Sequence, residues 1–172
     1  MIDIAQKVLD NLNAINDLVK VAEENRLNEI KQTTAQKNEV LNQQQQTELA
    51  QQNLNEQQKQ VINDKYARLK YQSDLKAFQE EDKIKRAQFK RDKALRIAQI
   101  AIDTASAIAK AIATYGPPPS PMGIFGIASA SAIGISQAAA VAAQQYQGGT
   151  MPQAPNVSSG VGAGASSFSI GT

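Results

Sequence analysis

The feature that most constrains this chain is the absence of helix-breaking residues from its first two thirds. No glycine precedes Gly116 and no proline precedes Pro117. Gln, Ala, Leu, Lys and Glu, which are good helix formers, are abundant over the same stretch. The sequence therefore predicts an all-α protein that begins with one or two very long helices between residue 2 and about residue 114.

Large apolar residues recur at a spacing of eleven within this stretch. Eleven residues make three turns at about 3.67 residues per turn, which produces a nearly straight or slightly right-handed supercoil. We expect a long extended helix or coiled coil that self-associates through these positions. The predicted oligomer seam consists of Val8, Val19, Ile30, Leu41, Phe78, Phe89 and Ile100.

A Gln-rich stretch interrupts this pattern between residues 42 and 60. Its only large apolar residues are Leu49 and Leu54. Two interpretations remain open, a hydrated and weakly specified coiled coil with a hinge, or an aggregation-prone Gln-rich segment. The helical patterns on both sides and the interleaved Glu and Lys residues favour helix through the stretch.

The net charge of +2 is distributed unevenly along the chain. Residues 61–110 carry twelve basic and seven acidic side chains, whereas the 62 residues after Lys110 carry no charge. Spacings of i, i+3, i+7 and i+10 place four basic residues on one helix face. This basic stripe consists of Lys83, Arg86, Lys90 and Lys93. It is either a solvated face or a contact surface for anionic lipid or the DNA backbone.

The uncharged part of the chain predicts two apolar helices around a proline-rich break. The break consists of Gly116, Pro117, Pro118, Pro119 and Pro121, because consecutive prolines cannot continue a helix and glycine suits its end. In the second helix, small residues recur every four positions and permit close helix approach. This close-packing face consists of Ala130, Gly134, Ala138 and Ala142. We expect an antiparallel hairpin that either packs inside an oligomer or enters a membrane when released.

These features predict three regions. Residues 1–92 form a polar coiled-coil rod, residues 93–147 form the Ala-rich hairpin with its tip at 116–121, and residues 148–172 form a flexible Gly/Ser-rich tail of the kind that is disordered alone. The N-terminus lacks a basic region followed by an apolar run, so we expect no secretory signal.

The residue types that common enzymes require are missing. The chain contains no Cys and no His, which excludes thiolate sites and removes the usual general base and metal ligand. Its densest carboxylates, Glu23-Glu24 and Glu80-Glu81-Asp82, are adjacent on predicted helices and point in different directions rather than across a cleft. We therefore predict a non-enzymatic protein without catalytic, cofactor or metal sites.

The order of motifs over residues 85–149 resembles the C-terminal region of tail tape measure proteins of tailed bacteriophages. A charged helix leads into KALRIAQIAIDTASAIAKA from Lys93, followed by the break GPPPSP and a small-residue helix that closes in QAAAVAAQQYQGG. The resemblance implies a virion protein held in the tail or portal lumen. It would assist tail assembly and genome ejection, and reach the host cell envelope during infection.

The resemblance also implies the partners of the chain. These are further copies of itself, the tail tube, portal or baseplate proteins, the end of the genomic DNA, and the host membrane on ejection. As a single helix the chain would reach about 260 Å, so the resemblance implies the ruler of a very short tail or a small related lumen protein. Two alternative functions remain, a membrane-active ejection protein that forms a conduit, and a coiled-coil scaffold or adaptor.

Overall fold

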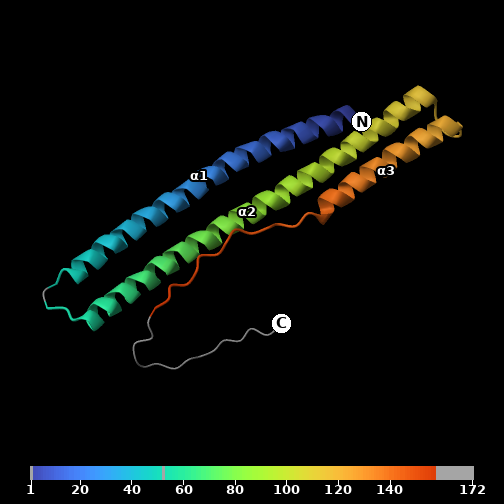
Figure 1. The fold of residues 1–172 in the computed structure, drawn as a ribbon. Coiled ribbons are helices and arrows are strands. Elements are labelled where there is room, and N and C mark those ends of the chain that lie inside the picture. Colours follow the sequence, from blue (N-terminus) through green and yellow to red (C-terminus); the bar gives the residue numbers. More distant parts are fainter. Residues whose placement is uncertain (1, 52, 158–172) are drawn as a thin grey trace. The chain divides into compact units, whose positions relative to one another are not determined.

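The computed structural model describes residues 2–51 and 53–157, and within these ranges the protein is all-helical, without strands. The described residues form three helices, α1 (Ile2–Leu49), α2 (Glu56–Tyr115) and α3 (Pro121–Ala143). Figure 1 shows the course of each helix. The predicted all-α class is therefore confirmed. Within the predicted tail, residues 148–157 belong to no helix, and residues 158–172 lie outside the described ranges.

The Gln-rich stretch is not helical throughout. α1 ends at Leu49, and Asn53 adopts a positive φ of 69°, a conformation that asparagine tolerates better than most residues. Asn55 then begins α2 through a reciprocal capping box with Gln58. The Asn55 side chain accepts a hydrogen bond from the Gln58 backbone N–H at 2.8 Å, and the Gln58 side chain accepts one from the Asn55 N–H at 2.9 Å. The expectation of helix across residues 42–60 is therefore wrong for residues 50, 51 and 53–55.

The chain packs as two compact units, and the predicted boundary after residue 92 falls inside α2. Unit 1 comprises Met1–Glu29 with Glu80–Gly149, and unit 2 comprises Ile30–Gln79 with the chain from Thr150. In unit 2 the end of α1 and the start of α2 run antiparallel on either side of the turn. Their contact buries Leu41, Tyr66 and Ser73.

In unit 1, α2 lies between the first part of α1 and α3. Asn16 of α1 bonds to Asp92, whereas Gly134 of α3 faces Thr104 on another side of α2. Among the described residues of unit 1, Leu9 is the only large apolar side chain that is buried, at 2% exposure. The exposed large apolar side chains of unit 1 are Ile4, Val8, Leu12, Ile15, Leu18, Val21, Ile97, Ile112, Tyr115, Met122, Ile124, Phe125, Ile133 and Ile135.

The proline-rich break lies between α2 and α3. α2 ends at Tyr115, and Gly116 has a φ of 84°, which glycine adopts without steric cost. Ser120 then caps α3, because its hydroxyl accepts a hydrogen bond from the Gly123 N–H at 3.1 Å and donates one to the Tyr115 carbonyl at 3.0 Å. Pro121 occupies the first turn of α3, where a missing N–H costs nothing. These local features allow α3 to run back along α2.

Candidate functional site

The four cations of the basic stripe on α2 differ in their contacts. Lys83 and Lys90 are exposed, and neither forms an ion pair with any residue in the described ranges. Arg86 and Lys93, one helical turn away from them on the same face, contact the chain that follows α3. The structure therefore places two of the four predicted cations in intramolecular contacts.

Lys93 holds the C-terminal end of α3. Its ammonium group donates hydrogen bonds to the carbonyl oxygens of Ala142, at 2.6 Å, and Gln144, at 2.8 Å. The last carbonyls of a helix have no partner within the helix, and they form the negative end of its dipole. A cation at this position therefore stabilises the end of α3 and ties it to α2.

Tyr146 lies two residues beyond the cap of α3 and packs on the same face of α2. Its hydroxyl donates a hydrogen bond to Asp82 Oδ1 at 2.8 Å, while Arg86 Nε donates to Asp82 Oδ2 at 2.6 Å. The Tyr146 ring lies 5.8 Å from the Phe89 ring at an angle of 56°, and the Arg86 guanidinium lies 5.3 Å from the Tyr146 ring centre. We call Asp82, Arg86, Phe89, Lys93 and Tyr146 the Tyr146 cluster.

The pKa shifts of Asp82 and Tyr146 both favour the hydrogen bond between them. The hydrogen bond from Tyr146, followed by that from Arg86, lowers the pKa of the Asp82 carboxyl. Burial, followed by the hydrogen bond to Asp82, raises the pKa of the Tyr146 hydroxyl. At neutral pH the carboxylate therefore accepts, and the neutral phenol donates.

A polar layer joins α1 to α2 within unit 1. The Asn16 side chain is buried, donates to Asp92 Oδ1 at 3.3 Å and accepts from Arg91 Nε at 3.4 Å. Lys20 pairs with Asp92 at 2.9 Å, and Arg91 pairs with Glu23. Burial raises the pKa of Asp92, but the hydrogen bonds from Lys20 and Asn16 outweigh it, so the pKa is lowered overall. A part-buried polar contact of this kind disfavours other registers, because a shift would leave the buried Asn16 amide unpaired.

The residues of the predicted oligomer seam differ widely in exposure. Leu41 is buried in unit 2, whereas Val8 is 53% exposed in unit 1. The other members are half-buried: Val19, Ile30, Phe78, Phe89 and Ile100. A single chain therefore covers the series only in part.

The close-packing face of α3 meets α2 most closely at Gly134. Gly134 is buried, and a Cβ atom there would lie 2.0 Å from Thr104 Oγ1. Ala130 and Ala138 are half-buried, and Ala142 is exposed. The same spacing of four extends to Gly126, where a Cβ would lie 3.0 Å from the Ala111 Cβ. It also extends to Tyr146, and continuing the series by one step would have found both residues.

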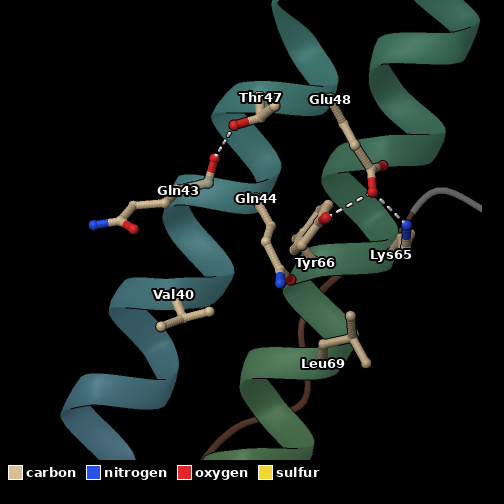
Figure 2. A pocket seen from close by; sticks show the side chains of 8 residues that line it. All are labelled: Val40, Gln43, Gln44, Thr47, Glu48, Lys65, Tyr66 and Leu69. Carbon is tan, nitrogen blue, oxygen red and sulfur yellow. Dashed lines mark hydrogen bonds and ion pairs between the residues drawn. The ribbon is translucent and has the colours of Figure 1, made fainter.

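Unit 2 contains a shallow, open groove of about 670 Å³. As Figure 2 shows, Glu48 of α1 bridges two residues of α2 there, accepting hydrogen bonds from Lys65 Nζ and Tyr66 Oη, each at 2.7 Å. Lys65, followed by Tyr66, lowers the pKa of Glu48. The groove is lined by Val40, Gln43, Gln44, Thr47, Glu48, Lys65, Tyr66 and Leu69. Its charged groups bond to each other and link the two helices, which indicates a structural contact.

α2 and α3 are each long and apolar enough to cross a membrane, judged by length and composition. In α2 the apolar stretch follows Arg96, and its only charged residues are Asp103 and Lys110. Little of either stretch is buried by the rest of the chain.

Within the described residues, no three His, Cys, Asp or Glu side chains are grouped as metal ligands would be. Comparisons with protein-family models, curated proteins and solved structures find no significant match to the chain.

Proposed function

We propose that this protein is a non-enzymatic structural component of a bacteriophage virion, held as a homo-oligomer in the tail or portal lumen. There it would assist tail assembly and genome ejection, as a short relative of tape measure proteins. The observation that carries the proposal is the uncovered apolar surface of unit 1, where Leu9 is the one large apolar side chain that is buried among the described residues. A surface of this kind calls for a covering partner in water.

The exposed apolar residues of unit 1 form two separate surfaces that partners could cover. Ile4, Val8, Leu12 and Ile15 follow one another at helical spacing along one exposed face of α1, which suits packing against another copy of the chain. Phe125 and Ile135, on α3, are each at least 70% exposed and offer a separate apolar surface. In the proposed location, neighbouring copies and the tube wall would cover these surfaces until ejection. The order of motifs over residues 85–149 supports the assignment to the tail or portal.

A second function, a membrane-active protein that forms a conduit during ejection, is favoured by one further observation. Two apolar stretches of spanning length, in the second half of α2 and in α3, are joined by a tight break and are mostly exposed. In this function Asp103 and Lys110 would face the interior of an oligomer, because charges facing lipid are costly.

The proposed location is tested by protease protection of purified virions. We expect the chain to resist digestion in intact particles and to become digestible after ejection is triggered, since the lumen excludes protease. An outer-surface tail protein, digested equally before and after triggering, is the control. Absence of the chain from purified particles, with assembly still dependent on it, would assign it to the scaffold class instead.

A further inference from the structure

A short segment of the chain lies along one side of its own basic stripe, where it contacts Arg86 and Lys93. Residues 144–149 follow α3, and we call them the cover segment. We infer that the cover segment is removable, and that the stripe beneath it, Lys83, Arg86, Lys90 and Lys93, is a binding site for the anionic headgroups of a lipid bilayer.

The contacts of the cover segment define what its removal would release. The Tyr146 ring lies between Arg86 and Phe89, and the Gln144 carbonyl accepts from Lys93. Lys83 and Lys90 remain exposed beside these contacts. With the cover segment in place, Lys93 is held by the carbonyl oxygens of Ala142 and Gln144, and Arg86, whose side chain is 62% exposed, pairs with Asp82 and lies against the Tyr146 ring. In the uncovered state all four cations form one continuous stripe.

The position of the stripe on α2 indicates a bilayer as its partner. Within one helix, the cations up to Arg96 are followed directly by the apolar stretch of spanning length. A bilayer has the matching order of layers, anionic headgroups followed by hydrocarbon. Recognition of single-stranded nucleic acid relies on exposed aromatic side chains for stacking. The stripe offers a single aromatic residue for such stacking, Phe89.

The same contacts couple lipid binding to the release of α3. Lys93 caps the C-terminal end of α3, so anionic headgroups that compete for Lys93 also remove one of the ties between α3 and α2. Binding at one site and opening at another are then linked in both directions. This inference goes beyond the proposed function, since it concerns the isolated chain and does not require a location inside a virion.

The first experiment measures partitioning of the full-length chain onto phosphatidylcholine vesicles with and without phosphatidylserine. Tyr146→Ala removes the ring contacts and the bond to Asp82. We expect its affinity for the anionic vesicles to rise between about fivefold and about 25-fold, because loosening the cover segment frees one or both of Arg86 and Lys93, at about fivefold each. The matched control is Gln145→Ala, which changes the exposed neighbour and should leave affinity unchanged. Adding Lys83→Gln and Lys90→Gln to Tyr146→Ala should lower affinity about fivefold per residue.

A second experiment keeps the proposal testable if Tyr146→Ala disturbs the fold. The chain has no cysteine, so Asp82→Cys with Gly148→Cys introduces a single pair. A Cβ atom on Gly148 would lie 3.5 Å from Asp82 Oδ1, which places the two positions within reach of a disulfide or a short crosslinker. The oxidised protein should bind anionic vesicles weakly, and the same protein after reduction should bind them strongly.

Three results would overturn the inference. Equal binding by the oxidised and reduced forms would show that the cover segment does not control the stripe. Equal binding to vesicles with and without phosphatidylserine would show that the apolar surface alone makes the contact. Tight binding of duplex DNA by Tyr146→Ala, without binding to anionic vesicles, would assign the stripe to nucleic acid. Each result leaves the virion location to be decided by its own protease test.

Discussion

Gly134 offers the most direct test of how α3 packs on α2. In Gly134→Ala the new Cβ would lie 2.0 Å from Thr104 Oγ1, 2.7 Å from its Cγ2 and 2.9 Å from its Cβ. Thr104 cannot turn away freely, because its hydroxyl donates to the Ile100 carbonyl at 2.7 Å. Overpacking of this kind costs about 1–3 kcal/mol. Replacing a helical glycine by alanine contributes about 1 kcal/mol in the other direction.

The expected net result is a loss of up to about 2 kcal/mol in the free energy that holds α3 in place. The assay is hydrogen exchange of the α3 amides, compared among wild type, Gly134→Ala, Thr104→Ala and the double variant. Thr104→Ala removes the two closest atoms and leaves only the Cβ at 2.9 Å, so in its background the cost of Gly134→Ala should be smaller. The double-mutant cycle should therefore give a coupling energy of about 1–2 kcal/mol. A coupling energy near zero would refute the contact, because the two residues would then act independently.

Three further predictions follow from other contacts. Val8→Asp should weaken self-association in sedimentation while leaving helix content unchanged, because Val8 is exposed. Leu9→Asp should instead lower the free energy of unfolding by about 3 kcal/mol or more, because Leu9 is buried within the chain. Equal effects of the two substitutions would contradict the assignment of Val8 to the surface. Ser120→Ala should cost about 1 kcal/mol in thermal unfolding, since it removes the cap of α3. The docking of Tyr146, followed by its ring resonances, should be lost as pH falls below about 4, because the lowered pKa of Asp82 stabilises docking only while the carboxylate is ionised. Docking should also be lost as pH rises above about 10, because the raised pKa of Tyr146 stabilises docking only while the phenol is protonated. Docking that is unchanged below about pH 4 and above about pH 10 would rule out the hydrogen bond between Tyr146 and Asp82.

Local features of the sequence were sufficient for the helical class and for one of the two helix breaks. The absence of glycine and proline before Gly116, and the prolines that follow it, act through backbone conformation within a few residues. The break after Leu49 has no glycine or proline to mark it. Its signal was the pair Asn55 and Gln58 at the spacing of a capping box, which the Gln-rich composition around it obscured.

The contacts of the Tyr146 cluster and of the polar layer were decided only by the tertiary structure. Asn16 and Asp92 are 76 residues apart in sequence, and Tyr146 and Asp82 are 64 apart. Periodicity shows which side chains share a helix face, but it does not specify which faces of different helices meet. For the same reason the sequence predicted a four-residue basic stripe, and only the fold revealed that Arg86 and Lys93 are held by the chain's own residues. Helix formation depends on neighbours in the chain, whereas the pairing of charges depends on neighbours in space.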